Sequence, residues 1–177
     1  MRTYIRVKQK GGMYFFTVNL AERKDNDLLI ANIGLLREAF RVTKKHYPFS
    51  IEASVILPEH LHCIWRLPEG DDDFSKRWRL IKAHFSKHIP LNEPVSNSRL
   101  RKKERGIWQR RFWEHVIRDD EDFSRHVDYI YFNPVKHGLV ESVADWPYST
   151  FHRDMQRGIY SKSWGSSYVD VLGNAGE

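Results

Sequence analysis

The chain has a single cysteine, Cys63, no long hydrophobic run and no low-complexity tract. A lone cysteine excludes a framework of disulfide bonds and is typical of a reducing cytoplasm. Apolar segments such as residues 53–57, interrupted only by Ser54, are far shorter than the roughly 20 residues that a membrane-spanning helix needs. No apolar segment follows the basic first ten residues, as one would in a secretory signal. We therefore expect a cytoplasmic protein with no membrane association.

The composition is that of a folded domain. The 177 residues are 41% hydrophobic and 14% aromatic, which excludes a disordered chain. A mean hydropathy of −0.62 argues against an integral membrane protein. This length suits one domain and leaves little room for a second. We expect the domain to span residues 1–160 and to be followed by a partly mobile tail over residues 161–177.

Acidic residues are scarce in the middle of the chain. Residues 76–118 hold thirteen Lys and Arg against three Glu, a local charge of +10, whereas the whole chain carries +6. Such a segment indicates a surface that faces a polyanion. Its aromatic residues are Trp78, Phe85, Trp108, Phe112 and Trp113. Cations for phosphates and flat side chains for bases favour a single-stranded nucleic acid as the partner.

The alternative for this basic segment is a solvated helix face followed by a charged loop, with the aromatic side chains in the core. Two prolines and a run of cations make residues 90–105 the best candidate for a mobile loop. If the segment binds nucleic acid, the candidate DNA-binding residues are Lys82, Arg99, Arg101, Lys102, Lys103, Arg110 and Arg111.

Hydrophobic periodicity predicts strands and helices in alternation. The expected strands are residues 13–20, 49–57, 60–67 and 108–117, and the expected helices are residues 29–47, 74–88 and 119–136. A tight turn at Pro58 joins the second and third strands into a hairpin. This order predicts an α+β fold with a ferredoxin-like antiparallel sheet (split βαβ), helices packed on one face and an irregular C-terminal extension.

The third predicted strand carries a pair of histidines, His60 and His62. Side chains alternate along a strand, so these two imidazoles project together, while Leu61 and Cys63 point to the other side. Two imidazoles at this spacing can chelate one metal ion. A zinc site that includes Cys63 is excluded by its position on the opposite face. Many such pairs simply line a surface, which is the alternative.

The last predicted helix carries Tyr129 and Asn133, one turn apart. A tyrosine beside an amide oxygen, facing the histidine pair, would combine a nucleophile with a third metal ligand. Arg125 and His126 share this helix face and are candidates to assist the tyrosine. The alternative is ordinary aromatic packing, and Pro134 disfavours helical geometry at the asparagine before it.

Three motifs carry a family resemblance: residues 58–62 (PEHLH), 126–138 (HVDYIYFNPVKHG) and 145–150 (DWPYST). In this order they resemble the HUH-type single-tyrosine transposases, and more narrowly the REP-associated tyrosine transposases, relatives of insertion-sequence transposases. The resemblance runs from about residue 11 to residue 160. It implies roles for four residues: metal ligands at His60 and His62, a third ligand at Asn133, and the nucleophile Tyr129.

The resemblance also implies an activity. The family cuts and rejoins single-stranded DNA at repetitive extragenic palindromes, through a 5′-phosphotyrosine and with a divalent metal ion. Imidazole and amide ligands suit Mg²⁺ or Mn²⁺ bound weakly. Hairpin DNA is the expected partner, the expected state is a monomer, and the expected location is the cytoplasm, with the nucleoid. The alternative from another class is a hairpin-binding protein that has lost catalysis, with RNA binding by the sheet as a weaker third.

Overall fold

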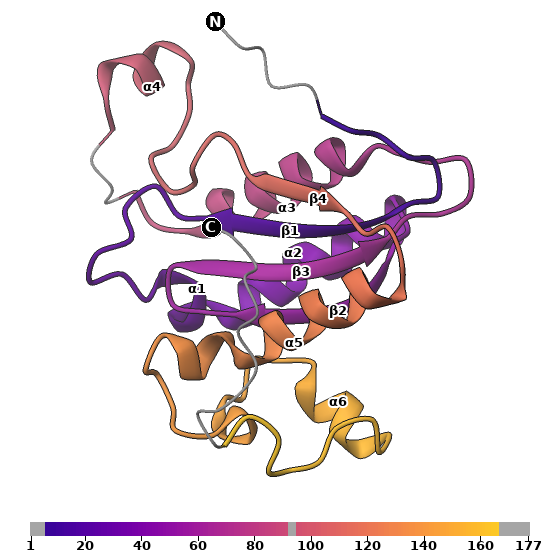
Figure 1. Ribbon diagram of the computed structural model, residues 1–177. Helices are drawn as coiled ribbons and strands as arrows, with labels where there is room; N and C mark the ends of the chain where they lie inside the picture. Colours follow the sequence, from indigo (N-terminus) through magenta and orange to yellow (C-terminus); the bar gives the residue numbers. More distant parts are fainter. Residues whose placement is uncertain (1–5, 92–94, 167–177) are drawn as a thin grey trace, which may run out of the picture.

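The computed structural model describes residues 6–91 and 95–166 and is organised around a four-stranded antiparallel sheet (Figure 1). The strands are β1 (Met13–Asn19), β2 (Ser50–Ile56), β3 (His60–Arg66) and β4 (Trp113–Val116). Their order across the sheet is β2-β3-β1-β4. Strands β2 and β3 form the expected hairpin, whereas helical segments connect β1 to β2 and β3 to β4. This arrangement confirms the ferredoxin-like α+β fold.

One face of the sheet is covered by three of the helices that connect the strands. They are α1 (Leu28–Ala31), α2 (Ile33–His46) and α3 (Phe74–His88). Phe16 and Trp65 of the sheet pack on this side against Trp78 of α3, and the two indole rings stack with centroids 4.2 Å apart. The Asp73 side chain accepts a hydrogen bond from the Lys76 backbone N–H at 3.0 Å. An acidic residue thus caps α3 where the sequence predicted the helix to begin.

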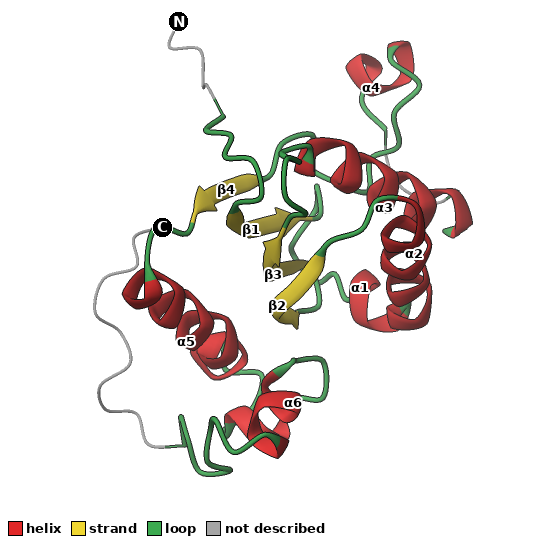
Figure 2. Cartoon of the chain, turned by 90° about the vertical axis from the view of Figure 1, so that its right-hand side faces the viewer, coloured by secondary structure: helices red, strands yellow, loops and turns green. Residues whose placement is uncertain are grey.

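The opposite face is covered by α5 (Asp120–Lys136), on the other side of the sheet from α2 and α3 (Figure 2). The sequence predicted that all helices pack on one face of the sheet. This prediction is wrong for α5, which packs on the other face (Figure 2). Val127 and Ile130 of α5 pack in a second core with Phe15 and Ile64 of the sheet. Because strand residues alternate between faces, Phe15 and Phe16 supply separate cores to the two layers of helices.

The C-terminal extension runs along the edge of β2 before it turns back to α5. It contains a short 3-10 helix, η1 (Val143–Asp145), and α6 (Phe151–Gln156). The Ile56 backbone N–H donates to the Tyr148 carbonyl at 2.8 Å, and the Thr150 N–H donates to the Ser54 carbonyl at 2.9 Å. The segment 145–150 therefore covers the edge of β2. Residues 161–166 of the predicted tail are described, and residues 167–177 lie outside the described residues.

The predicted loop, residues 90–105, lies in the segment between α3 and β4. It includes α4 (Asn97–Arg101), and Arg105 donates hydrogen bonds to the carbonyls of Ile89 at 2.6 Å and Pro90 at 2.7 Å. Residues 92–94 of this segment lie outside the described residues. β4 is shorter than the predicted strand 108–117, because Trp108 forms only an isolated bridge to Leu20.

Cys63 is 1% exposed and belongs to the core under α2 and α3. Burial raises the pKa of its thiol well above the usual value. This position, opposite to the histidines on β3, confirms the alternation expected from the sequence. The thiol is therefore a packing group in the part of the chain that the structure describes.

Candidate active site

His60 and His62 project from β3 toward α5 and line a pocket of about 460 Å³. Each is 3% exposed, and their ring centroids lie 4.9 Å apart. The pocket is lined by Phe15, Thr17, Asn19, Arg23, His60, His62, Trp113, His126, Tyr129, Lys136 and His137. The alternation of β3 thus brings both imidazoles into one cavity between the sheet and α5.

Neighbouring side chains hold one nitrogen of each imidazole. His60 Nδ1 lies 2.9 Å from Glu59 Oε1, and His62 Nδ1 lies 2.8 Å from Thr17 Oγ1. Within the described residues, His62 Nε2 is buried and has no hydrogen-bond partner. Partners of this kind orient metal-binding histidines, because they leave the second ring nitrogen to the ion.

Both imidazoles are favoured in the neutral form that binds metal. Burial lowers the pKa of His60 to about 4, although Glu59 acts in the opposite direction. Burial, and next the neighbouring His60, lower the pKa of His62 well below its usual value. A neutral imidazole keeps a lone pair available for coordination.

Tyr129 faces the histidine pair from α5. Its ring centroid lies 5.2 Å from that of His62 and 6.0 Å from that of Phe15. The Lys136 ammonium lies 5.2 Å from the centre of the tyrosine ring. The phenol therefore lies in the same pocket as the two imidazoles and close to a cation.

Tyr131, two residues further along α5, is in a different environment. It is 0% exposed, and its hydroxyl donates a hydrogen bond to the Asp154 carboxylate. Burial and this hydrogen bond raise the pKa of its phenol. Of these two tyrosines, Tyr129 is thus the one in the pocket, and Tyr131 is a core residue.

Asn133 lies on α5 one turn beyond Tyr129 and is fully buried. Neither the oxygen nor the nitrogen of its amide has a hydrogen-bond partner among residues 6–91 and 95–166. A buried amide without partners is costly, so a ligand is expected to satisfy it. α5 continues through Pro134 to Lys136, so the proline does not end the helix at Asn133.

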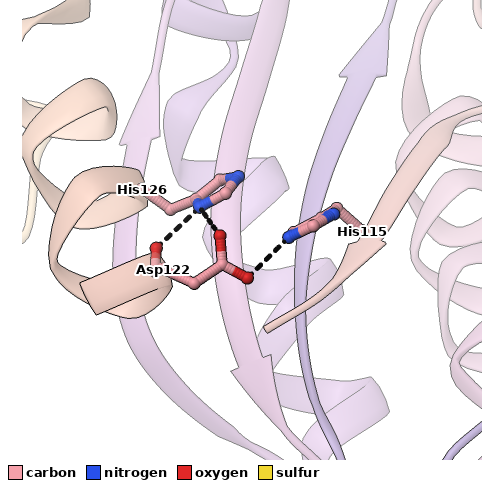
Figure 3. Close-up of side chains that lie close together, drawn as sticks. All are labelled: His115, Asp122 and His126. Atoms are coloured by element: carbon pink, nitrogen blue, oxygen red, sulfur yellow. Dashed lines mark hydrogen bonds and ion pairs between the residues drawn. The ribbon is translucent and has the colours of Figure 1, made fainter. Parts of the chain in front are cut away.

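The N-terminal turn of α5 holds His126 through a cluster with Asp122 and His115 (Figure 3). His126 Nδ1 donates to the Asp122 carbonyl at 2.7 Å and lies 3.2 Å from its carboxylate. The carboxylate also accepts hydrogen bonds from His115 Nε2 at 2.8 Å and Arg118 Nε at 3.1 Å. His126 lines the pocket, whereas Arg125 is exposed and lies 3.5 Å from Glu121.

The Asp122 cluster has the residue types of a metal site, with ligand atoms within 4.8 Å of one another. Its atoms are nevertheless engaged in hydrogen bonds. Burial favours the protonated form of Asp122, but the hydrogen bonds from Arg118 and His115 outweigh burial and lower the pKa of its carboxyl. Because the Arg118 guanidinium neutralises this carboxylate, the cluster is best described as a brace that positions His126.

Comparison with known proteins identifies the family of this chain. No protein-family model matches the chain. A REP-associated tyrosine transposase of Escherichia coli (strain K12) is 51% identical over 177 residues, covering 100% of this chain and 98% of that protein. The chain belongs to the REP-associated tyrosine transposase family. A Haemophilus influenzae protein assigned to the same group is 48% identical over 168 residues, 94% of this chain and 95% of its own.

A solved structure of a REP-associated tyrosine transposase bound to a REP hairpin shares the whole fold. Its TM-score is 0.82 at 49% sequence identity, covering 99% of this chain and 96% of that chain. The family resemblance inferred from the three motifs is thereby confirmed. None of the described helices is long and apolar enough to cross a bilayer.

In this transposase chain, some predicted DNA-binding cations make internal contacts. Lys82 Nζ donates to the Gln109 carbonyl at 3.0 Å, and burial lowers its pKa to about 8. Arg99 donates to the carbonyls of Arg105 at 2.7 Å and Trp108 at 3.0 Å. These side chains brace the segment between α3 and β4 in the described structure.

The other predicted DNA-binding cations are exposed. Arg110 pairs with Glu104 at 2.6 Å and bonds to Ser98 at 3.1 Å. The remaining ones lie in and after α4 and just before β4, namely Arg101, Lys102, Lys103 and Arg111. These four stay the best candidates for phosphate contacts, because their heads are in solvent.

His137 was not selected from the sequence as a site residue. It is the C-terminal cap of α5, and its ring centroid lies 5.2 Å from that of His60. The signal was present in the motif, since Tyr129, Asn133 and His137 are spaced four residues apart, one helical turn at a time. A third histidine therefore stands at the rim of the pocket that holds the pair on β3.

Replacing Asp122 by Ala is expected to lower the free energy of unfolding at pH 7 by about 2–3 kcal/mol, because charge-assisted hydrogen bonds from Arg118 and His115 are lost. The folded pKa of this carboxyl lies below its unfolded value near 3.9, so its stabilisation is present above that pH and is lost as the pH falls. Urea unfolding at pH 7 and pH 3 should therefore show a smaller difference between wild type and variant at pH 3.

The matched control is Asp120→Ala, which removes an exposed acid from the same helical turn. It should cost less than about 1 kcal/mol, the usual size of an interaction with the helix dipole. An equal loss in the free energy of unfolding for the two variants would show that Asp122 does not brace His126 through its hydrogen bonds.

Proposed function

We propose that the protein is a site-specific single-strand DNA endonuclease and strand transferase that acts on REP-like hairpins through Tyr129. The observation that carries the proposal is one pocket that holds Tyr129 opposite His60 and His62, each histidine held at Nδ1 by a neighbour. The related transposase solved with a REP hairpin supports hairpin DNA as the substrate. Because one chain supplies both histidines and the tyrosine, a monomer suffices for the reaction.

The proposed step is a transesterification at phosphorus. The Tyr129 phenol oxygen attacks the scissile phosphate, a bond forms between phosphorus and that oxygen, and the bond to the 3′ oxygen breaks. The products are a 5′-phosphotyrosine and a 3′ oxygen that takes up a proton and becomes a free hydroxyl. Since one phosphate ester replaces another, the step can run backward and join strands.

Mg²⁺ or Mn²⁺ is the proposed cofactor, and the residues present fit it. His60, His62 and Asn133 would hold the ion, because two neutral imidazoles line the pocket and the buried amide of Asn133, which has no partner among the described residues, lies one helical turn from Tyr129. When bound, the ion would polarise the scissile phosphate and stabilise negative charge on its oxygens.

The phenol of Tyr129 must lose its proton to attack, and an unperturbed tyrosine has a pKa near 10. His126 is favoured over Arg125 as the assisting residue, since it lines the pocket and Asp122 holds its Nδ1. Burial lowers the pKa of His126, so the ring is available as a neutral proton acceptor. Lys136, close to the tyrosine ring, would stabilise the phenolate.

The decisive experiment is incubation of the protein with a labelled hairpin oligonucleotide that carries single-stranded flanks, with Mg²⁺ or Mn²⁺. Denaturing electrophoresis should show a shortened strand and a protein-linked strand, and mass spectrometry should place the link on Tyr129. Binding without either product would favour the alternative, a hairpin-binding protein without catalysis. A chelator should remove both products and serves as the control.

Hairpin affinity should fall steeply with salt, and the slope should depend on Arg101, Lys102 and Lys103. Changing all three to Gln should make the slope of log K against log salt shallower by about 2, because each phosphate contact on a single strand contributes about 0.7. Arg99 and Arg105 are left intact, since their guanidinium groups bond to backbone carbonyls. The measurement is fluorescence anisotropy across a series of salt concentrations.

The matched control changes three exposed cations on other elements to Gln, namely Lys45, Arg157 and Lys162. Both triple variants lose the same charge, so only contacts with DNA distinguish them. An equal slope in the wild type and in the first triple variant would mean that the loop after α4 is a solvated run with no contact to the DNA backbone.

A further inference from the structure

The aromatic residues interleaved with the basic segment fall into two groups. Four of them pack inside the fold, namely Trp78, Phe85, Trp108 and Phe112. Trp113 instead is 48% exposed. Stacking on a base needs an accessible ring face, so Trp113 is the member of this group that meets that requirement.

Trp113 is the first residue of β4 and lies at the edge of the sheet, opposite Thr17 of β1. It lines the same pocket as His62 and Tyr129. Phe15 contacts it edge-on, with centroids 5.6 Å apart and the planes at 71°. The His115 ring lies parallel to it at 6.0 Å. The indole is thus held in place on the protein side while about half of it faces solvent.

The surroundings of Trp113 are cationic. Arg111 is exposed just before β4, and Lys136 lines the pocket from α5. An exposed indole beside such charges suits a polyanion that carries flat apolar rings. A nucleic-acid strand has both features, whereas an apolar peptide would bring no anion to Arg111 and Lys136.

We propose that Trp113 is a stacking platform for one unpaired nucleobase of the DNA strand whose phosphate enters the pocket. The inference rests on the proposed function, because it takes the pocket to hold that strand. The indole fixes the position of one nucleotide next to the nucleophile. Stacking depends little on base identity, so Trp113 sets register and affinity while other residues read the sequence.

The test measures hairpin affinity for wild type, Trp113→Leu and Trp113→Phe, with oligonucleotides that carry one abasic site at successive positions of the flanks. Leucine keeps apolar packing on Phe15 but offers no flat ring. It should weaken binding about 5- to 150-fold, which corresponds to roughly 1–3 kcal/mol for one stacked base. Phenylalanine should restore most of the affinity.

Coupling identifies the stacked base. With an abasic site at one flank position, wild type and Trp113→Leu should bind equally, because the partner of the indole is missing. At every other position the difference should persist. The control is Ile159→Ala, which removes an apolar side chain that is 64% exposed and lines none of the pocket described above, and it should leave affinity unchanged.

Two results would overturn the stacking role: unchanged affinity in Trp113→Leu, or a loss that is the same at all abasic positions. The measurements use the Tyr129→Phe background without metal, so they do not depend on cleavage. If the coupling is observed but the wild type forms no covalent product with DNA, the proposed nuclease activity is wrong and the stacking role of Trp113 stands. If a covalent product forms but no coupling is observed, the nuclease activity stands and the stacking role is wrong. If the protein does not bind DNA, both proposals are wrong.

Discussion

Replacing Tyr129 by Phe should abolish strand cleavage and the covalent protein–DNA link, with a loss in rate of at least about 10⁴-fold, as for removal of other enzymatic nucleophiles. The change removes the phenol oxygen and keeps the ring that contacts His62 and Phe15. Hairpin affinity should therefore remain within about threefold, since no packing surface is lost. Single-turnover cleavage of a labelled hairpin measures the first effect, and anisotropy measures the second.

Tyr131→Phe is the matched control on the same helix. It deletes a hydroxyl that is buried and bonded to Asp154, so it should lower thermal stability and keep the covalent link. A link that persists in Tyr129→Phe, or one that maps to Tyr131, would show that the nucleophile has been assigned to the wrong residue.

Removing either histidine of β3 should remove metal-dependent cleavage. His60→Ala and His62→Ala each delete an imidazole that faces the pocket, and we expect Mn²⁺ affinity to fall by at least about 100-fold, the upper end of the effect of losing an outer-shell partner. Mn²⁺ binding can be followed by electron paramagnetic resonance of the free ion, without DNA. Both histidines are buried, so thermal unfolding should be recorded for each variant.

Two further variants separate metal binding from packing. Thr17→Val removes the group bonded to His62 Nδ1 and should weaken Mn²⁺ binding about 10-fold while the imidazole stays in place. His88→Ala removes an exposed histidine on α3 and should change nothing. Undiminished cleavage in His60→Ala or His62→Ala would rule out the proposed metal site.

Local patterns predicted much of this structure. Alternation along residues 60–66 correctly assigned His60 and His62 to one face and Cys63 to the other, and hydrophobic periodicity correctly placed the helix 74–88. These features depend on residues close in sequence. The prediction that all helices pack on one face of the sheet was wrong for α5, because a helical stripe indicates that a partner surface exists but not which one.

In the basic segment, residues 76–118, composition alone does not predict which cations are available to bind DNA. Lys82, Arg99 and Arg105 add to its charge in the same way as Lys102, yet their heads bond to backbone carbonyls inside the fold. A carbonyl oxygen and a phosphate oxygen both accept from a cation, so the residue type alone does not separate the two. The same holds for the aromatic residues, among which only the arrangement of the sheet distinguishes Trp113 from Trp78.

The buried thiol of Cys63 can serve as a built-in probe for local opening of the fold. It is the chain's one cysteine, is 1% exposed, and lines a cavity of about 480 Å³ together with residues of α2, β2 and the segment 147–150. Because the thiol is almost fully buried, a thiol-reactive dye reacts with it only when the packing around this cavity opens, so the labelling rate measures that opening. The pocket lies on the opposite face of the same sheet. A comparison of the labelling rate with and without hairpin DNA would therefore show whether DNA bound on one face of the sheet slows opening on the other face.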